Sequence, residues 1–467
     1  MTKNIILPVI AICFALNPCA VFGQDEISRN LMRISPDEAV ELAIKNNLGL
    51  EQQRVSVSTK QRASSHAWNS FLPTITLSGG PNINSSTSDT TGDFQTPNMT
   101  KQTQTSSAVA FQGQVQVQFL INFALFEALK TLRMDYETGR LSLEQAKLQM
   151  ERDIRKSYFN MMLMEEQIKQ LQESQRNAEE QAISAETQYR AGRQPELNYL
   201  QARVNVGTMK PSIDQAVNGL KLAKSNFAMT LGLPLDTDFD LFLPVEKIRY
   251  IPLDTQDLIR RAKGNNPDIQ VQVQQLQTLM SQRKAQSYQK WTPNLSLGWS
   301  GGFSNSNSDT GVDTNLGNTK LKNDTLSTNS SVTLGLSWTA TSLLPFSKDA
   351  QSIKDLDDSV KTLSIALAQA EQGTELDITN KVYALEQIRA NIEAQQATAE
   401  LAERSYSETL RAYNSGLQNL LQVQTADLQL RNARLNLYQQ ESNYLQGLID
   451  LEYSIGAPFG SLMTQTE

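Results

Sequence analysis

The chain has 467 residues, of which 39% are hydrophobic, and its formal charge at pH 7 is −7. This length corresponds to about three ordinary domains, and the negative charge argues against a nucleic-acid-binding protein. His66 is the only histidine, so a His-based metal site or a Ser/His/Asp triad has no second imidazole, and we expect no enzymatic activity, no metal and no cofactor.

Residues 1–23 are predicted to be a secretory signal peptide. A lysine precedes an apolar stretch, and cleavage is expected after Gly23. Cys13 and Cys19 both fall inside this segment, so the mature chain would carry neither a thiol nor a disulfide. Pro18 directly before Cys19 fits a lipidation signal poorly, and we expect no lipid anchor. No later apolar run approaches the roughly 20 residues that a membrane-spanning helix needs.

Four short motifs occur twice in the same order, separated by about 220 residues. Because this period is far longer than the roughly 20 to 50 residues of solenoid repeats, we expect a duplication in which each copy is one structural half. The halves are predicted at 24–235 and 253–456, with a linker at 236–252 and a tail at 457–467. The motifs are Asn46-Asn47 with Asn265-Asn266, Pro73 with Pro293, Tyr189-Arg190-Ala191-Gly192 with Tyr413-Asn414-Ser415-Gly416, and Leu231-Gly232 with Ile455-Gly456.

Each half is predicted to contain a short helix, a strand, a polar loop, a second strand and two long helices joined by a glycine turn. In the first half, glutamine occupies every other position of one strand, at Gln112, Gln114, Gln116 and Gln118, with apolar residues or glycine between. This period of two puts all the amides on one face. The expected elements are a short helix near 36–46, strands at about 71–83 and 108–121, and long helices at about 125–189 and 195–231.

The second half is predicted to repeat this plan. The segments between the strands, 81–107 and 304–331, are rich in Ser, Thr, Asn and Gly and are expected to be long solvated loops. The long helices would reach about 100 Å if continuous, and their apolar spacing predicts coiled-coil packing. Pro211 lies inside one of them, where we expect a kink or a break. The second-half elements are a short helix near 254–265, strands at about 293–303 and 331–339, and long helices at about 349–413 and 417–453.

A strand with one polar face fits two kinds of protein. In a soluble sandwich the amides would face water, and in a membrane barrel they would line an aqueous lumen. The predicted export, the hairpins and the aromatic residues of the opposite face favour the barrel. Four strands cannot close a barrel wide enough for solutes, and an open sheet edge is not tolerated in lipid, so several copies must share one wall. The aromatic residues are Phe111, Phe119, Trp299, Phe303 and Trp338.

The duplicated plan and the paired Tyr-x-x-Gly turns resemble the outer-membrane efflux protein family, the TolC-like channel-tunnels. The resemblance covers essentially the whole chain after the predicted signal peptide. It implies a mainly α fold with membrane β, in which a homotrimer forms a twelve-stranded β-barrel, four strands per chain, continued into a long periplasmic α-helical coiled-coil tunnel. The implied location is the outer membrane of a Gram-negative-type envelope. The implied function is the passive exit duct of a tripartite efflux or type I secretion system.

The resemblance also implies partners. A periplasmic adaptor protein would dock on the two turns and connect the duct to an inner-membrane transporter of RND, ABC or MFS type, and outer-membrane lipid would surround the barrel. The linker and tail would join an equatorial belt, and the four glutamines would line the barrel lumen. The docking residues would be Tyr189, Arg190, Ala191, Gly192, Arg193, Gln194, Tyr413, Asn414, Ser415, Gly416, Leu417 and Gln418.

Members of the family often place aspartates just after these turns, at a constriction of the periplasmic entrance. The matching positions here are Asn198, Gln422 and Thr425, none of which is acidic, and Gln418 replaces an arginine that the family has in the second turn. A ring of carboxylates attracts cations, whereas amides do so weakly. We therefore expect an entrance with little cation preference.

A trimeric coiled-coil surface adhesin or a structural outer-membrane protein is the alternative. Such a protein would also combine coiled coil with barrel strands. It predicts a single C-terminal membrane anchor, whereas the strands here are predicted early in each half.

Overall fold

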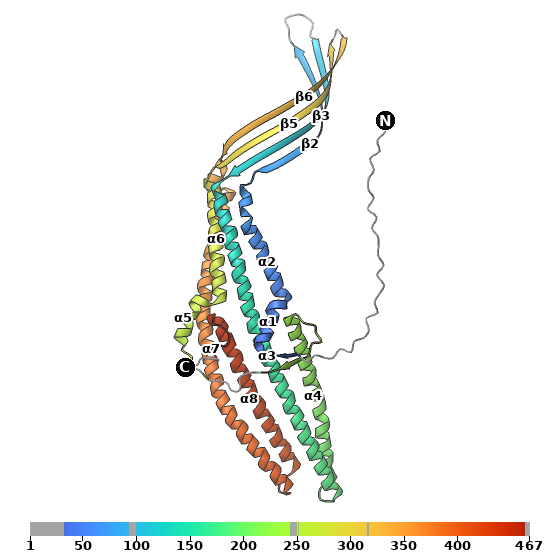
Figure 1. Ribbon diagram of the computed structural model, residues 1–467, viewed down its shortest axis with the longest axis vertical. Helices are drawn as coiled ribbons and strands as arrows, with labels where there is room; N and C mark the ends of the chain where they lie inside the picture. Colours follow the sequence, from blue (N-terminus) through green and yellow to red (C-terminus); the bar gives the residue numbers. More distant parts are fainter. Residues whose placement is uncertain (1–31, 93–99, 243–249, 251, 315–316, 463–467) are drawn as a thin grey trace, which may run out of the picture.

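The computed structural model describes residues 32–92, 100–242, 250, 252–314 and 317–462. The predicted signal peptide, part of the linker and the last residues of the tail lie outside these ranges. The described chain is elongated, with a β-sheet at one end and long helices that run away from it (Figure 1).

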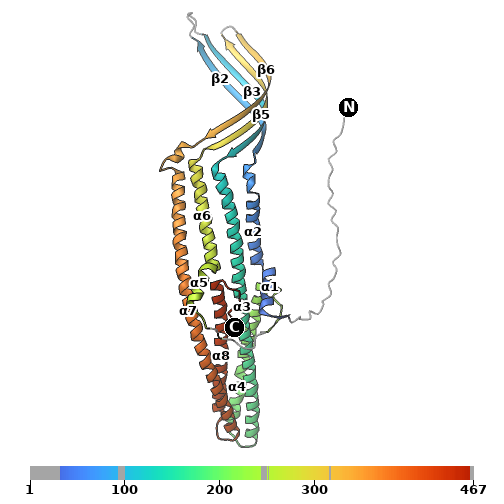
Figure 2. The same ribbon diagram turned by 60° about the vertical axis from the view of Figure 1, so that its left-hand side comes forward.

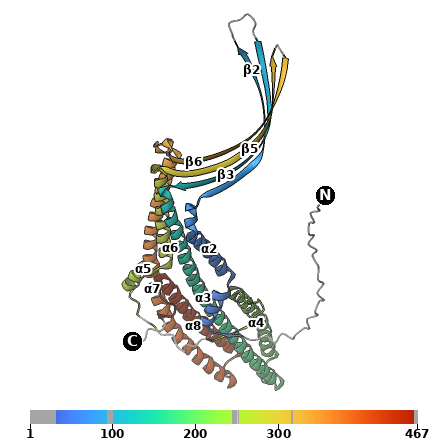
Figure 3. The same ribbon diagram turned by 45° about the horizontal axis from the view of Figure 1, so that its top comes forward.

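Four long strands form one antiparallel sheet in the order β2-β3-β5-β6. The two hairpins therefore lie side by side, and β3 pairs with β5 across the two halves of the chain. The strands curve together as they leave the helices (Figure 3). Within the described chain β2 and β6 are the edges of the sheet. The bounds are β2 Thr74–Gly92, β3 Thr100–Ile121, β5 Asn294–Thr314 and β6 Gly317–Ser337.

The segments 81–107 and 304–331 were predicted to be long loops, and that prediction is wrong. Apart from residues 93–99 and 315–316, which lie outside the described ranges, they continue the strands. The ladder between β2 and β3 runs from Thr74 opposite Gln118 to Gly92 opposite Thr100. Beyond the apolar part of the sheet both faces are polar, so these segments lack the alternation that marks a half-buried strand. Pairing with the neighbouring strands, rather than local pattern, extends them.

Next to the sheet, helices stand side by side in the order α2-α3-α6-α7 (Figure 2). Farther away, α4 replaces α2 and α8 replaces α6, while α3 and α7 continue through both zones. The 68 residues of α3 extend about 100 Å at 1.5 Å per residue. None of the described helices is both long enough and apolar enough to cross a membrane. The bounds are α2 Leu48–Ser65, α3 Phe123–Arg190, α4 Glu196–Leu231, α6 Pro267–Trp291, α7 Lys348–Asn414 and α8 Leu420–Ile455.

Two features of the helices differ from the prediction. An additional helix, α2 or α6, lies between the short helix (α1 Pro36–Asn46 or α5 Thr255–Asn265) and the first strand of each half. Of the kink or break expected at Pro211, a break is absent, because α4 runs through this residue.

Asn47 joins α2 to α4 end to end at mid-height. Its Oδ1 accepts the backbone N–H of Leu50 at 3.1 Å and caps the start of α2. Its Nδ2 donates to the carbonyl of Thr230 at the end of α4, at 2.8 Å. One side chain thus pairs groups that two helix ends would otherwise leave without partners. As a result α4 continues the line of α2.

Asn266 makes the same joint in the second half. Its Oδ1 accepts the backbone N–H groups of Asp268 and Ile269, at 2.9 and 3.1 Å, and its Nδ2 donates to the carbonyl of Ser454 at 2.9 Å. Gly456 ends α8 in the left-handed conformation with φ of 63°, where a Cβ would collide with the carbonyl of Asn265. The recurring Asn-Asn and glycine motifs of the sequence therefore meet in space.

The main core lies at this mid-height belt. Strand β1 (Met32–Ile34) pairs in parallel with β4 (Phe239–Leu241), and Tyr158 of α3 is buried against them. The Tyr158 hydroxyl donates to the carbonyl of Ile34 at 2.8 Å and accepts the N–H of Phe242 at 2.7 Å. Burial raises the pKa of Tyr158 to about 12, so the hydroxyl stays neutral at physiological pH. A second cluster around Ile378 and Leu448 fills the belt in the other half.

We predict that Asn266→Ala lowers the free energy of unfolding by about 1 to 3 kcal/mol, because α6 loses its cap and the buried carbonyl of Ser454 loses its donor. Denaturant unfolding of the detergent-solubilised protein, followed by circular dichroism, measures this change. Asn391→Ala, at an exposed position of α7, is the control and should leave stability unchanged or slightly raised. Equal stability of Asn266→Ala and wild type would contradict the joint.

Candidate functional site: a two-sided sheet and a paired helical tip

One face of the sheet carries a band of large apolar side chains. On β3 the band runs from Phe111 to Phe119, about nine residues, which is close to the 9 to 11 that a strand needs to cross a bilayer. Most of these side chains are exposed in the single chain. The band comprises Ile75, Leu77, Phe111, Val115, Val117, Phe119, Leu295, Leu297, Trp299, Phe303, Val332, Leu334 and Leu336.

The predicted aromatic residues sit on this face or beside it. Trp299 donates its indole N–H to the Ser330 hydroxyl at 3.2 Å, and Trp338, just after β6, donates to the carbonyl of Lys290 at 3.3 Å. The ring of Phe303 covers Gly113, where a Cβ would approach it to 2.6 Å. The apolar face therefore has its indole groups paired, and glycine makes room for one of its rings.

The opposite face is polar along the same length. Gln112, Gln114, Gln116 and Gln118 form one exposed row on β3, and threonine, serine or glycine lies opposite each of them on β2 and β5. The structure thus brings the four predicted lumen residues together on one surface.

At the far end of the molecule, two glycine turns connect the long helices. Gly192 and Gly416 have φ of 68° and 77°. In the first turn the N–H of Arg193 bonds to the carbonyl of Gln188, and in the second the N–H of Leu417 bonds to the carbonyl of Ala412, both at 2.9 Å. These are matching Schellman ends, which need a residue that tolerates the left-handed conformation. The repeated Tyr-x-x-Gly motif therefore encodes the shape of the turn.

The two turns are packed against each other through Tyr413. This side chain is 3% exposed and belongs to an apolar cluster with Ala185, Ala202, Leu420 and Val423. Burial raises the pKa of its hydroxyl. The Gln194 side chain of the other turn lies beside the hydroxyl and lowers that pKa, although no hydrogen bond of ordinary geometry joins them. Gln194 and Tyr413, predicted separately as docking residues, thus lie together.

Tyr189, the counterpart of Tyr413, has different surroundings. Its ring stacks on that of Tyr199 with centroids 6.1 Å apart, and Arg203 donates to the Tyr199 hydroxyl at 3.0 Å. The other predicted docking residues, Arg190, Ala191, Gly192, Arg193, Asn414, Ser415, Gly416, Leu417 and Gln418, are exposed. The sequence analysis did not single out Tyr199 or Arg203, although their spacing of four on one helix could have indicated the contact.

Two of the four predicted constriction residues, Gln422 and Asn198, make hydrogen bonds to neighbouring residues. Gln422 belongs to the capping box of α8, because its side chain accepts the N–H of Asn419 at 3.0 Å. Asn198 donates to Gln194 at 3.1 Å. Thr425 and Gln418 are exposed. Within one chain the structure therefore places these four residues at the tip without bringing them around a common centre.

A polar contact holds the two hairpins together above the turns. Ser174 of α3 donates to the Asp427 carboxylate of α8 at 2.6 Å. Arg434 of α8 lies 3.8 Å from Glu173 of α3 and 3.3 Å from Glu403 of α7. The tip thus combines a small apolar cluster with charged contacts that separation of the hairpins would break.

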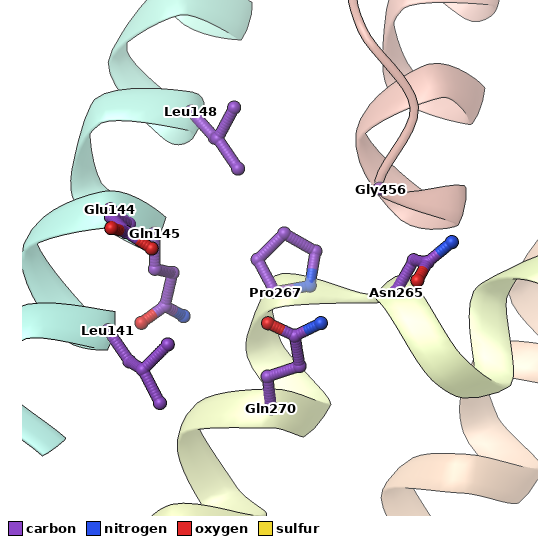
Figure 4. Close-up of a pocket in the computed structure, with 8 residues that line it drawn as sticks. All are labelled: Leu141, Glu144, Gln145, Leu148, Asn265, Pro267, Gln270 and Gly456. Atoms are coloured by element: carbon purple, nitrogen blue, oxygen red, sulfur yellow. The ribbon is translucent and has the colours of Figure 1, made fainter. Parts of the chain in front are cut away.

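A cavity of about 230 Å³ lies where α3 faces the joint of α6 and α8. On its wall Gln145 donates to Asp268 at 2.5 Å, and Asp268 also accepts the Tyr453 hydroxyl at 2.8 Å. Burial and this hydrogen bond raise the pKa of Tyr453 to about 12. In the described part of the chain no cluster of side chains fits a metal ion. The cavity is lined by Leu141, Glu144, Gln145, Leu148, Asn265, Pro267, Gln270 and Gly456 (Figure 4).

Comparison with known proteins identifies the family of this chain. The family model described as outer membrane efflux protein matches residues 39–227 and again residues 258–457. The chain belongs to the outer membrane efflux protein family. Its place is the outer membrane with the helical part in the periplasm, and its function is that of the outer-membrane channel of an efflux system. The family and the fold are those of passive channels.

Solved structures show the same fold at low sequence identity. The channel CusC matches with a TM-score of 0.69 and 15% identity over 92% of this chain and 94% of that chain. The Campylobacter jejuni outer membrane channel CmeC gives 0.67 and 17% over 90% and 85%. The open state of the Neisseria gonorrhoeae MtrE outer membrane channel gives 0.61 and 15% over 90% and 89%. No curated protein sequence matches significantly.

We predict that Thr425→Asp adds cation preference to the channel. The side chain is exposed just after the second turn, where a carboxylate attracts cations and raises sensitivity to block by divalent ions. The reversal potential under a salt gradient should shift by on the order of 10 mV toward cation selectivity. Thr425→Asn, similar in size but neutral, should leave it unchanged. An unshifted reversal potential for the aspartate variant would remove Thr425 from the conducting path.

Proposed function

We propose that three copies of this chain close a twelve-stranded barrel and form the exit duct of a tripartite efflux or type I secretion system. The single observation that carries this proposal is the sheet of four strands, apolar on one face and polar on the other, with two open edges. In lipid such edges must be paired. Since β2 and β6 run in opposite directions, the edge of one copy can pair with the edge of the next.

The polar face then becomes the wall of the lumen. Gln112, Gln114, Gln116 and Gln118 would line it, and the apolar band would contact outer-membrane lipid. The helices below the sheet would continue the wall as a periplasmic tunnel, because α2, α3, α6 and α7 each connect to a strand. Transport through this duct is passive, and no residue performs covalent chemistry.

The turns at the tip would dock a periplasmic adaptor protein. Gly192 and Gly416 have open space beside them, so a partner can approach their backbone closely. Exposed apolar side chains surround the turns, with Leu417 80% exposed, Leu421 67% and Leu197 61%. A family of efflux channels implies such an adaptor and an inner-membrane transporter, which we take to be of RND, ABC or MFS type.

The alternative of a coiled-coil adhesin has no support here. It requires one C-terminal membrane anchor, whereas β2 and β3 precede the long helices of the first half and β5 and β6 precede those of the second. None of the matches described above favours it.

The first test of the duct is conduction by the purified protein. We expect a trimer in detergent by light scattering, and stepwise conductance increases when it is added to a planar bilayer. A protein that remains a monomer without detergent, or a trimer that gives no conductance, would overturn the proposal. The barrel contribution can be checked with Gln114→Trp, which narrows the proposed lumen and should lower the conductance.

The docking surface gives a separate prediction. Leu417→Glu should reduce capture of the adaptor by about tenfold, because it places a charge in an apolar contact. Crosslinking in cells followed by co-purification measures the capture. Lys322→Glu, at the opposite end of the molecule, is the control variant. Trimer assembly and conductance are compared between the two variants. Unchanged capture by Leu417→Glu would exclude Leu417 from the docking surface.

A further inference from the structure

The charged residues of the sheet all lie on one face. Seven charged residues fall within the strand bounds. The register places Asp89 and Asp313 opposite Thr103, two residues after Lys101, and all of these β3 positions are an even number of residues from Phe111. The other four have described side chains: Asp309, Lys320, Lys322 and Asp324. Asp309 pairs with Lys322, Asp324 pairs with Asn307, and Lys320 pairs with Gly311. On β3 the residues opposite these β5 positions are Ser107, Val109 and Thr105. They have the same parity as Phe111, so every one of the four charges belongs to the face of the apolar band.

The other face is uncharged over its whole described length. It extends from Gln118 to Gln104 on β3, about 50 Å at 3.4 Å per residue. It therefore passes well beyond the apolar band into the part of the sheet outside the lipid. Leu120, at the helix end of β3, and Leu321 are its large apolar side chains among the described residues. The face includes Thr74, Thr76, Ser78, Gly80, Asn82, Asn84, Ser86, Ser88, Gln104, Ser106, Ala108, Ala110, Gln112, Gln114, Gln116, Gln118, Leu120, Ser296, Gly298, Ser300, Gly302, Ser304, Ser306, Ser308, Thr310, Thr319, Leu321, Asn323, Thr325, Ser327, Asn329, Ser331, Thr333 and Gly335.

Several hydroxyl groups of this face are paired across the strands. Ser86 bonds to Ser106 and Ser300 bonds to Ser331, both at 2.8 Å between the hydroxyl oxygens. Ser296 donates to the carbonyl of Gly335 at 3.2 Å. These groups are satisfied by the wall itself, so they need no ion or charged ligand as a partner.

We propose that the barrel forms a neutral sleeve that conducts anionic, cationic and zwitterionic solutes without preference. This inference rests on the proposed function, in which the polar face lines the lumen. A fixed charge in a pore attracts solutes of one sign, delays their release and repels the other sign, whereas a wall of amides and hydroxyls does neither. The sleeve therefore accepts substrates of either charge, and selection by charge belongs to the helical tunnel and the partners upstream.

The test measures charge preference at one lumen position. Cys13 and Cys19 lie in the predicted signal peptide, so Gln114→Cys should provide the only thiol of each mature chain, three in the trimer. Anionic sulfonatoethyl and cationic trimethylammonioethyl methanethiosulfonate are added from the extracellular side of a planar bilayer, and current change reports the reaction. Each rate is divided by the rate of the same reagent with a small free thiol. Gln116→Cys is the second variant, in case the first assembles poorly.

We expect the two normalised rates to agree within about threefold. Adding Gln112→Glu beside the cysteine should favour the cationic reagent by about tenfold or more, and adding Lys322→Glu, an acidic change on the other face, should leave the ratio unchanged. A preference above tenfold in Gln114→Cys alone would overturn the neutral sleeve and leave the duct intact. A conducting channel in which neither cysteine reacts would instead overturn the assignment of this face to the lumen, and with it the proposed function.

Discussion

The outer edges of the sheet impose the strongest constraint on this molecule. The backbone N–H and C=O groups along β2 and β6 that point away from the sheet find no strand partner within the described chain. In a bilayer each unpaired group costs several kcal/mol, so an open sheet of four strands is not a stable state there. A closed ring of strands removes this cost. Because each strand is connected to one of the helices α2, α3, α6 and α7, closing the sheet also places these helices in a ring.

A wall only one helix thick has little interior to bury, and this explains where the core lies. The two large apolar clusters sit at the belt, where α1, α5 and the β1–β4 pair add a second layer. The helices that return from the tip, α4 and α8, also end there. Asn47 and Asn266 allow α2 and α6 to continue their lines without a continuous chain. Mid-height is therefore both the place where the chain leaves the wall and the place where the wall is best anchored.

The sequence predicted those elements in which the local residue pattern reflects the final structure directly. The alternation in 108–121 and the glycine turns at Gly192 and Gly416 have direct structural causes, in the two-sided sheet and the left-handed helix ends. The outer halves of the strands could not be predicted, because both faces there meet water and the residues carry no alternation. The continuity of α4 at Pro211 could not be predicted either, because the residue type alone favours an interruption there. The sequence analysis also missed the role of Gln422 in the cap of α8, because the resemblance placed this residue at the constriction.

Strand and helix geometry also explain why the charged residues of the sheet lie on one face only. In a strand, alternate residues point to opposite faces, so each of the two faces is independent of the other. A helix in a one-layer wall contacts neighbours on two sides, and only narrow stripes of its surface remain for the lumen and the periplasm. Charged residues such as Glu173 and Arg434, which lie 3.8 Å apart, then link neighbouring hairpins. In the proposed duct, the sheet is thus the part whose inner face can remain uncharged without loss of packing, and selection by charge falls to the helical tunnel and the partners upstream.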